Sequence, residues 1–356
     1  MLIYNTIGVM SGTSLDGIDI VYAGFYYEKN WEYKVKKGTT FPYDNVWKDK
    51  LSKASLLSGL EIIRLHKDFG LLLAEKINMF IEKHGINNNK IDLIASHGHT
   101  VFHQPENKIT LQIGCGLEIS RITKIKTVCD FRSLDVAHGG QGAPLVPIGD
   151  LHLFNNYKYC LNIGGIANIS FDSNNKRIAG DIDFANINSN LLANSLGFEM
   201  DENGRLAESG KLNNELLQKL SEISFYSEKF PKSLGIEDYY KWYKPVLDNF
   251  NIKIQDKLHT TGFHLCSNIK KIVDRKNYLN LLITGGGVFN KFWINTLIKM
   301  DVNIVIPKKE IIDFKEALIF AFLGVLRVRN EINTLASVTG ATKDLISGIL
   351  YDPKKF

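Results

Sequence analysis

Apolar and polar positions alternate in blocks along the amino-terminal part of the chain. Two apolar runs within residues 3–27 flank the polar link Gly12-Thr13-Ser14-Leu15-Asp16-Gly17. Glycine tolerates the positive φ angles of tight turns, so the pattern predicts a β-hairpin, followed by a further strand over residues 31–40. The hydroxyls of Ser11, Thr13 and Ser14 beside Asp16 suit binding of phosphate oxygens or a polar substrate, and an ordinary turn is the alternative.

A helix and a buried strand follow this hairpin. Near-helical spacing of apolar residues predicts a helix from about residue 55 to residue 82. The run "IDLIASHGHTVFHQP" has an apolar start and a polar, glycine-containing end, which is typical of the carboxyl edge of a strand where α/β proteins bind ligands. The apolar positions that indicate the helix are Leu56, Leu60, Ile63, Leu71, Leu72, Ile77 and Phe80.

The second half of the chain repeats the pattern of the first. Strands predicted at "KTVCDFR", "YCLNIGGIANIS" and "LNLLITGGGVFN" are separated by helices, which indicates an α/β class with mixed sheets. The middle segment contains an apolar run, the turn Gly164-Gly165 and another apolar run. Two similar hairpins half a chain apart predict two related halves that face one cleft. Residues 213–250 are rich in Lys, Glu and Tyr, and we expect surface helices there.

Composition narrows the function classes. At 356 residues the chain exceeds the usual size of one core, so about two domains are expected. Neither a bilayer-spanning apolar run nor a secretory signal is visible, which makes the cytoplasm the expected location. The net charge of +5 is scattered, which argues against a nucleic-acid partner and is compatible with anionic small substrates. Widely spaced cysteines in or beside apolar segments predict buried, reduced thiols, in preference to disulfides or a zinc site, at Cys115, Cys129, Cys160 and Cys266.

Two polar segments contain candidate ligands for a metal or an anionic group. His97, His99 and His103 would share one face of a strand, which raises a metal hypothesis, but hydrogen bonding of a substrate is favoured because no nearby carboxylate or cysteine completes a site. Arg132 lies between two aspartates, beside the loop Gly139-Gly140-Gln141-Gly142. Its fork suits an anionic substrate group, and an inter-strand salt bridge is the alternative.

A pair of carboxylates and a glycine run complete the candidate chemistry. Strand alternation would put Asp181 and Asp183 on one face, where a carboxylate can act as a general base; a polar surface loop is the alternative. Residues 285–287, all glycine, join an apolar strand to a helix and allow backbone amides to approach phosphate or a purine ring. The run matches neither a Walker A motif nor a dinucleotide fingerprint. Glycine turns without a Walker lysine resemble those of the sugar kinase, actin and heat-shock chaperone ATPase superfamily.

Taken together, the motifs resemble a more specific family, the 1,6-anhydro-N-acetylmuramic acid kinases. The resemblance covers nearly the whole chain in family order. It is carried by "GVMSGTSLDGID", "SHGHTVFH", "DFRSLDVAHGGQGAPLVP", "NIGGIANIS", "PKSLGIE", "TGGGVFN", "KEALIFAFLG" and "SVTGA".

The resemblance implies a fold and a reaction. The fold would be two actin-like (ribonuclease H-like) α/β domains around a central cleft, with residues 1–129 and 335–356 in the first and 130–334 in the second. The enzyme would use ATP and Mg²⁺ to open 1,6-anhydro-N-acetylmuramic acid hydrolytically and phosphorylate O6, giving N-acetylmuramic acid 6-phosphate in cell-wall (peptidoglycan) recycling. The family also suggests a homodimer. An alternative is a non-catalytic ATP-binding protein of chaperone-ATPase-like fold.

The resemblance also assigns site residues. Asp181 would be the base that deprotonates water, Arg132 would bind the lactyl carboxylate and Glu316 would contact the sugar. Further substrate contacts would come from His97, Gln141 and Asn186. The nucleotide would be bound by Gly12, Thr13, Ser14, Asp16 and Gly17 of the first hairpin, by Gly164 and Gly165 of the second, and by Gly285, Gly286 and Gly287 beside the adenosine.

One departure from the family pattern bears on the base. Many members have Asp-Thr-Gly-Pro-Gly-Asn where residues 181–186 have Asp-Ile-Asp-Phe-Ala-Asn. Anchoring the motif on Asn186 makes Asp181 the base, and anchoring it on Asn188 makes it Asp183. We prefer Asp181 because the downstream helix then needs no gap. His99 also stands where glutamine is usual.

Overall fold

The computed structural model describes residues 2–273 and 280–355 and divides the chain into two compact units. Unit 1 comprises Met1–Leu153 and Phe314–Phe356, and unit 2 comprises Phe154–Asp313. The divisions expected after residues 129 and 334 therefore differ from the compact units. Residues 130–153 and 314–334 belong to unit 1, because the long helix α13 (Lys309–Arg329) lies directly on that unit's sheet. Its Gly324 approaches Ala95 so closely that a Cβ would meet the alanine methyl at 2.6 Å.

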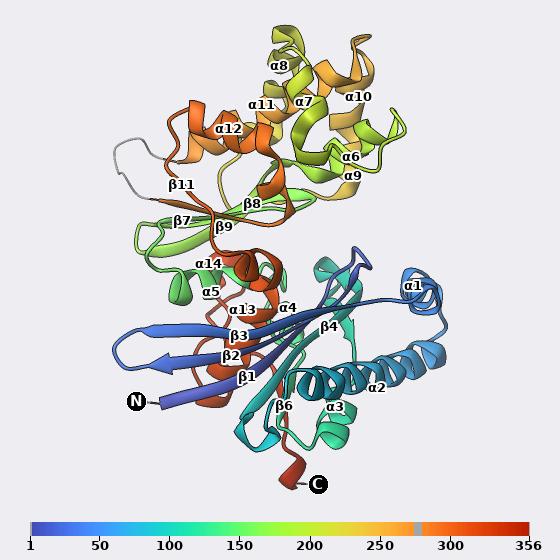
Figure 1. Cartoon of the computed structure of the whole chain (residues 1–356), viewed down its shortest axis with the longest axis vertical. Coiled ribbons are helices and arrows are strands. Elements are labelled where there is room, and N and C mark those ends of the chain that lie inside the picture. Colours follow the sequence, from blue (N-terminus) through green and yellow to red (C-terminus); the bar gives the residue numbers. More distant parts are fainter. Residues whose placement is uncertain (1, 274–279, 356) are drawn as a thin grey trace. The chain divides into compact units, whose positions relative to one another are not determined.

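The sheet of unit 1 begins with the predicted hairpin. β1 pairs antiparallel with β2, and β2 with β3, whereas β4 lies parallel to β1 and β6 parallel to β4. The strand order is β12-β6-β4-β1-β2-β3, and β5 pairs with β4. Figure 1 labels β6, β4, β1, β2 and β3 of this sheet. The strands are β1 (Leu2–Ser11), β2 (Gly17–Tyr27), β3 (Trp31–Pro42), β4 (Leu93–Gln104), β5 (Ile109–Ile113), β6 (Thr127–Cys129) and β12 (Ile349–Tyr351).

Helices cover both faces of this sheet. Adjacent residues of β1 point to opposite faces: Ile7 belongs to the core cluster that contains Phe69 of α2, whereas Gly8 approaches the carbonyl of Ala317 in α13. Helices α2 and α13 therefore cover opposite faces. The helices of this unit are α1 (Asn45–Ser52), α2 (Gly59–Lys83), α3 (Gly116–Thr123), α4 (Ser133–Ala137), α5 (Val146–Leu153), α13 and α14 (Ala336–Thr339).

The predicted helix over residues 55–82 is confirmed in its greater part. A short 3₁₀ turn at Ala54–Leu56 precedes α2, which begins with a capping box in which Glu61 accepts from the backbone and hydroxyl of Ser58. The first apolar positions of the pattern do not face the core, because buried residues of α2 begin only at Leu65. The exposed ones are Leu56, Leu60 and Ile63.

The sheet of unit 2 has the same strand order as the main part of the first. Antiparallel strands β7, β8 and β9 are followed by β10 parallel to β7 and by β11 parallel to β10, in the order β11-β10-β7-β8-β9. This matches β6-β4-β1-β2-β3 of unit 1, so the prediction of two related halves is confirmed. The strands are β7 (Tyr159–Ile163), β8 (Ile166–Ser173), β9 (Lys176–Phe184), β10 (Leu281–Thr284) and β11 (Ile304–Val305).

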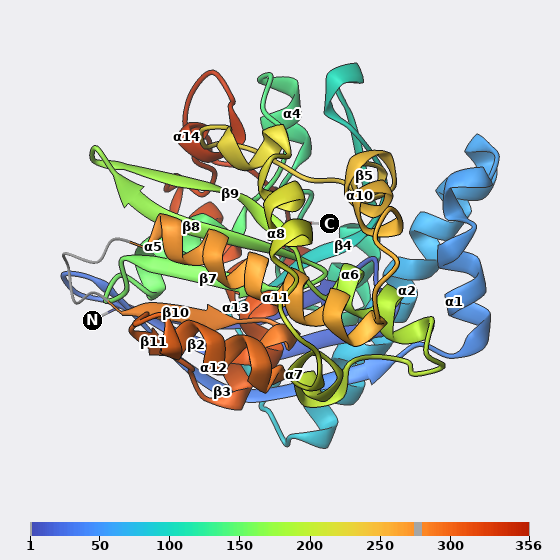
Figure 2. The same cartoon turned by 90° about the horizontal axis from the view of Figure 1, so that it is seen from above.

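The described residues of unit 2 include two apolar clusters. The larger joins its sheet to α11, which overlies the sheet in Figure 2, and to α12. The smaller surrounds Phe184 and includes Tyr239 and Tyr243. These buried tyrosines show that residues 213–250 form more than the expected surface helices. The helices are α6 (Asn186–Asn194), α7 (Arg205–Ser209), α8 (Asn214–Ser221), α9 (Ile236–Asp238), α10 (Lys244–Asp248), α11 (Ile254–Ile272) and α12 (Lys291–Lys299).

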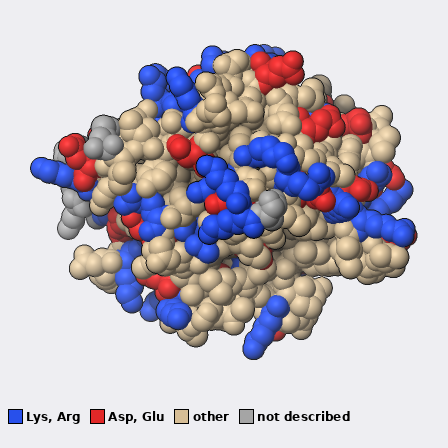
Figure 3. Space-filling model, turned by 90° about the horizontal axis from the view of Figure 1, so that it is seen from below, with Lys and Arg blue, Asp and Glu red and all other residues tan. Residues whose placement is uncertain are grey.

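Surface and thiol properties complete the description. On the face drawn in Figure 3, Lys and Arg side chains are interspersed with Asp and Glu and with uncharged surface. None of the helices within the described residues is long and apolar enough to cross a membrane. All four cysteines carry free thiols, as predicted. The expected burial holds for Cys160 and Cys266, whereas Cys115 and Cys129 are only partly buried.

Candidate active site

The β1–β2 turn of unit 1 presents polar groups on a strained loop. Thr13, Ser14 and Asp16 are exposed. The positive φ of the turn belongs to Leu15, at 60°, and not to either flanking glycine. Gly17 is needed for another reason, since a Cβ there would lie 2.5 Å from the carbonyl oxygen of Phe41 on β3. The loop therefore leaves its hydroxyls and carboxylate available to a ligand.

Ser11 has a different environment from the other hydroxyls of this segment. It is buried, and its Oγ lies 2.7 Å from the hydroxyl of Tyr43 and 2.9 Å from Nδ1 of His99. These contacts connect the end of β1 to β4. We infer that Ser11 supports the turn from within the core, while the exposed hydroxyls face solvent.

The three histidines of β4 do not share a face, so that prediction is wrong. His97 packs on Phe320 of α13 with ring centroids 4.6 Å apart, and His99 packs against Phe69 of α2 at 6.0 Å. The cause is Gly98, whose φ of +75° interrupts strand alternation. His103 is exposed and contacts Thr110. Within residues 2–273 and 280–355, no three His, Cys, Asp or Glu side chains are grouped as metal ligands.

Arg132 forms its hydrogen bonds with a histidine and a carbonyl. Its Nε donates to Nε2 of His97 at 3.0 Å and its Nη1 to the carbonyl of Gly142 at 2.5 Å. Because Nε2 of His97 accepts, its Nδ1 donates to the carbonyl of Gly98. Burial, reinforced by Arg132, lowers the pKa of His97 well below its usual value. Burial also lowers the pKa of Arg132 to about 10, so the guanidinium is charged at neutral pH.

The buried carboxylate of Asp135 stabilises the glycine loop beside Arg132 through hydrogen bonds. Asp135 accepts from the amide of Gly142 and from the hydroxyl of Thr339, both at 2.7 Å. The amide of Gln141 donates to the carbonyl of Thr339 at 2.8 Å. Two motifs about 200 residues apart thus form one structure, and the side chain of Gln141 is left exposed.

Glu316 extends this cluster on α13. It lies one helical turn before Phe320, on the helix face whose ring contacts His97. Glu316 keeps accessible surface, although protein atoms surround its carboxyl. Desolvation by surrounding protein raises the pKa of its carboxyl, and the nearby charge of Arg132 opposes that shift. Within unit 1, the sequence-predicted residues His97, Arg132, Gln141 and Glu316 therefore lie in one region.

Unit 2 carries a row of polar side chains across its strands. In register, Thr284 of β10 faces Asn162 of β7, Asn162 faces Asn168 of β8, and Asn168 faces Asp181 of β9. Cross-strand partners project from the same face of a sheet. Asp181 is thus one end of a polar row near the turn at residues 164–165.

Glycines of unit 2 gather next to this row. The carbonyls of Gly164 and Gly165 accept from the amides of Asn186 and Ala185, which places the start of α6 on the turn. Gly285 has a φ of +84°, and a Cβ there would lie 2.6 Å from Oδ1 of Asn162. Gly286 is exposed, with Nδ2 of Asn186 the nearest atom to an added Cβ at 3.8 Å. Every predicted site residue of this unit therefore lies at one end of its sheet.

The two aspartates of β9 have different environments, so the prediction of a shared face is wrong. A β-bulge puts three residues of β9, 181–183, opposite only Asn168 and Ala167 of β8. Because adjacent residues of β8 point to opposite faces, so do the two aspartates. Asp181 is partly exposed, whereas Asp183 has 0% of its surface accessible.

Asp181 is oriented by the segment that follows η5 (Ser224–Ser227). Its carboxylate accepts from the amide of Leu234 at 2.8 Å and from the hydroxyl of Ser233 at 3.4 Å, and its own amide donates to the carbonyl of Lys232. Burial raises the pKa of the carboxyl. Sequence reasoning noted the "PKSLGIE" run only as a family motif and did not anticipate its contact with Asp181.

The comparisons agree with this reading of the motifs. The family model described as anhydro-N-acetylmuramic acid kinase matches residues 4–353. An anhydro-N-acetylmuramic acid kinase of Pasteurella multocida is 32% identical over 376 residues, covering 98% of this chain and 97% of the relative. One from Clostridioides difficile is 31% identical, covering 99% of each. Among solved structures, the (R)-2-hydroxyglutaryl-CoA dehydratase component A of Acidaminococcus fermentans has a TM-score of 0.45 at 11% identity, over 92% of this chain and 99% of that one.

The family model and the relatives match both units of the chain along nearly their whole length. The sequence-based identification is confirmed: the chain belongs to the anhydro-N-acetylmuramic acid kinase family.

Proposed function

We propose that the chain uses ATP and water to convert 1,6-anhydro-N-acetylmuramic acid into N-acetylmuramic acid 6-phosphate and ADP, in peptidoglycan recycling. The observation that carries this proposal is the position of Asp181, a partly exposed carboxylate in a polar row beside two glycine turns. Family membership supplies the substrate class. The expected site of the reaction is the cytoplasm, and the homodimer suggested by the family stays a prediction.

Asp181 would act as the general base. Its raised pKa makes it a stronger proton acceptor than an ordinary aspartate, and the Leu234 amide fixes one oxygen. The carboxylate takes a proton from water as the water oxygen bonds to the anomeric carbon. The bond between that carbon and O6 breaks, and O6 attacks the γ-phosphorus of ATP, releasing ADP. Asp183 is unsuited to this role because no part of its side chain reaches solvent.

The glycine turns would bind the nucleotide. Glycines let backbone amides and a ligand approach closely, and the exposed Gly286 is uncrowded, since an added Cβ would make only an ordinary contact with Nδ2 of Asn186 at 3.8 Å. Residues 164–165 and 12–17 would face the phosphates, and residues 285–287 the adenosine. Mg²⁺ would accompany the nucleotide, because it binds phosphate oxygens, water and typically one or two carboxylates, and Asp16 of the 12–17 turn has an exposed carboxylate. When bound, it would neutralise charge on the transferred phosphoryl group.

Arg132 would bind the lactyl carboxylate of the sugar. The bonds to His97 and Gly142 use two of the five N–H donors of its guanidinium, and the rest suit a carboxylate. His97 is only 5% exposed and has both ring nitrogens hydrogen-bonded, so we assign it the role of orienting Arg132. Gln141 and Glu316 expose side chains that would contact the sugar, and so would Asn186 in unit 2.

The test follows oxygen as well as phosphate. Wild-type protein and Asp181→Asn would be incubated with Mg·ATP and the anhydro sugar in ¹⁸O-labelled water, and products identified by mass spectrometry. Wild type should give a 6-phosphate labelled at the anomeric position, and the variant should not. ATP binding without sugar phosphate would favour the non-catalytic ATP-binding alternative, which the family match over residues 4–353 does not favour. Loss of turnover in Asp183→Asn alone would move the base to Asp183.

A further inference from the structure

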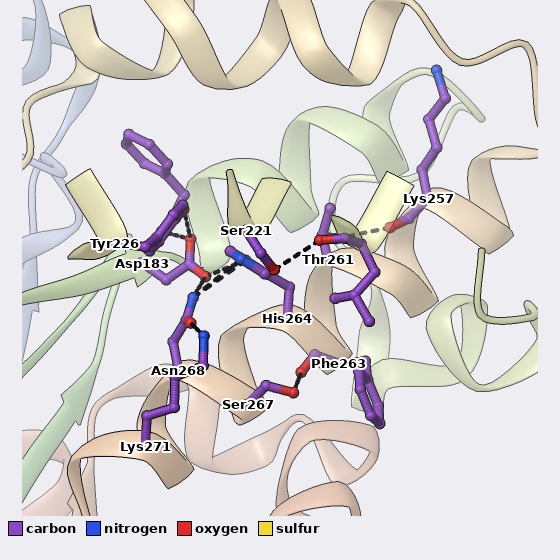
Figure 4. Close-up of polar contacts among 12 residues, drawn as sticks. Asp183, Ser221, Tyr226, Lys257, Thr261, Phe263, His264, Ser267, Asn268 and Lys271 are labelled. Atoms are coloured by element: carbon purple, nitrogen blue, oxygen red, sulfur yellow. Dashed lines mark hydrogen bonds and ion pairs between the residues drawn. The ribbon is translucent and has the colours of Figure 1, made fainter. Parts of the chain in front are cut away.

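The Asp183 carboxylate is the centre of a buried hydrogen-bond network in unit 2. One oxygen accepts from the amide of Phe184 at 2.8 Å and from the hydroxyl of Tyr226 at 2.6 Å. The other lies 2.8 Å from Nδ1 of His264 and 3.0 Å from Nδ2 of Asn268 (Figure 4). Four donors match the four acceptor sites of an ionised carboxylate. We call the four side chains Asp183, Tyr226, His264 and Asn268 the Asp183 network.

The donors of the network are held in defined orientations. Burial, together with the charge of Asp183, raises the pKa of Tyr226 far above its usual value, so its hydroxyl stays a donor. Asn268 accepts from Nζ of Lys271 through its oxygen at 3.0 Å, which directs its nitrogen toward Asp183. The rings of Tyr226 and His264 pack edge to face at 4.6 Å. The carboxylate therefore joins β9 to two other segments, η5 and α11, in one arrangement.

The network lies on the segment that connects the candidate base to a candidate sugar contact. Asp183 follows Asp181 by two residues and precedes Asn186 by three. Just beyond it, the amides of Ala185 and Asn186 donate to the carbonyls of the turn at residues 164–165, at 2.9 and 3.2 Å. The bulge directs Asp183 to the sheet face opposite Asp181. The Asp183 network therefore stabilises the junction between β9 and α6 on the face opposite the polar row.

We infer that Asp183 is a positioning residue: its buried carboxylate, through the Asp183 network, holds the β9–α6 junction so that Asp181 and Asn186 keep their places beside the turn at residues 164–165. This inference rests on the function proposed above. Without the carboxylate, the three side-chain donors and the amide of Phe184 lose their acceptor and must rearrange or admit water. Misplacement of a reacting group by 1 Å can cost about 10²-fold in rate.

The test compares Asp183→Asn with Asp201→Asn in the full-length chain. Asp201 is also a buried carboxylate of unit 2, but it accepts from the amides of Leu206 and Ala207, outside the network. For each protein, kcat would be divided by the stoichiometry of binding of a non-hydrolysable ATP analogue, so that unfolded protein does not count. Asp183→Asn should lower kcat per competent site by about tenfold or more, and Asp201→Asn should leave it within about twofold of wild type. Tyr226→Phe, which removes one donor and keeps the ring, should give a smaller decrease.

The outcomes separate the inference from the proposed function. If wild type makes sugar phosphate and Asp183→Asn keeps the wild-type kcat per competent site, Asp183 only stabilises the fold and the inference is overturned while the function stands. If wild type makes no sugar phosphate, both fail. If Asp183→Asn does not fold, Tyr226→Phe decides: an unchanged kcat per site counts against positioning. Abolished turnover in Asp183→Asn with full activity in Asp181→Asn would make Asp183 the base and overturn the positioning role.

Discussion

Replacement of Asp135 by alanine tests whether the glycine loop of unit 1 depends on one carboxylate. Asp135 is fully buried and accepts from the Gly142 amide and the Thr339 hydroxyl, both at 2.7 Å. A hydrogen bond to a charged group contributes about 1.5–3 kcal/mol, so losing both should cost about 3–6 kcal/mol. That is a large share of a typical unfolding free energy of about 5–15 kcal/mol. Thr339→Val removes one partner and should cost about half as much.

Hydrogen exchange followed by mass spectrometry is the appropriate assay, because a chain of two units need not unfold in one step. Asp135→Ala should lower protection in residues 133–142 and also in residues 335–345, although Asp135 and Thr339 are 204 positions apart. The double variant with Thr339→Val should show a coupling of about 0.5–3 kcal/mol. Asp49→Ala is the control, since its ion pair with Lys53 is exposed on α1 and should contribute under about 1 kcal/mol.

Two results would show that Asp135 does not hold the loop in this way. Unchanged protection in residues 335–345 would show that the carboxylate does not connect the two segments. A zero coupling energy would show that the hydroxyl of Thr339 does not stabilise the loop through Asp135. If the reasoning holds, Asp135→Ala should also raise the Michaelis constant for the anhydro sugar, because Gln141 lies in the released loop.

Further predictions concern the base, the arginine and the glycines. Asp181→Asn should lower kcat by about 10²–10⁴-fold, and the wild-type rate should fall as pH drops through the raised pKa of that carboxyl. Because the pKa of Asp181 is raised in the folded state, ionisation of this carboxyl opposes folding when the pH lies above that pKa. At neutral pH the urea concentration that unfolds Asp181→Asn should therefore equal or exceed that for wild type. Arg132→Lys replaces the fork by a point charge and should raise the Michaelis constant for the sugar about tenfold while that for ATP stays within about twofold. Gly287→Ala would overlap the Ile163 side chain and should destabilise unit 2 by about 1–3 kcal/mol, whereas Gly286→Ala has room and should mainly raise the Michaelis constant for ATP.

These predictions have clear contrary results. If kcat did not fall as the pH dropped through a pKa above the usual aspartate range, Asp181 would not be the base. Equal changes in both Michaelis constants for Arg132→Lys would argue against a specific carboxylate contact. If Gly286→Ala bound ATP as well as wild type does, the exposed glycine would not contact the nucleotide. Urea unfolding and steady-state kinetics suffice for all three.

Much of the fold follows from the sequence because its signals are local. Apolar runs with glycine turns predicted the hairpins of both units, and the alternation of strands and helices predicted the α/β class. Hydrophobic periodicity extends over only a few residues, so it can be recognised in the sequence before the fold is known. Periodicity gave a wrong prediction at the start of the helix. Leu56 and Leu60 fit the apolar pattern but are exposed, because buried residues of α2 begin only at Leu65.

The site depended on features that a pattern cannot show. A bulge at residues 181–183 and a positive φ at Gly98 each reversed the face of one side chain, because a single irregular residue shifts a period of two. Asp183 contacts Tyr226, 43 positions away, and Asn268, 85 positions away, and no sequence motif marks either partner. Local periodicity and short motifs were sufficient to predict the elements, the related halves and the family. Which of the two carboxylates is exposed and which is buried is visible only in the folded molecule, because it depends on strand register and on side chains brought together from distant parts of the chain.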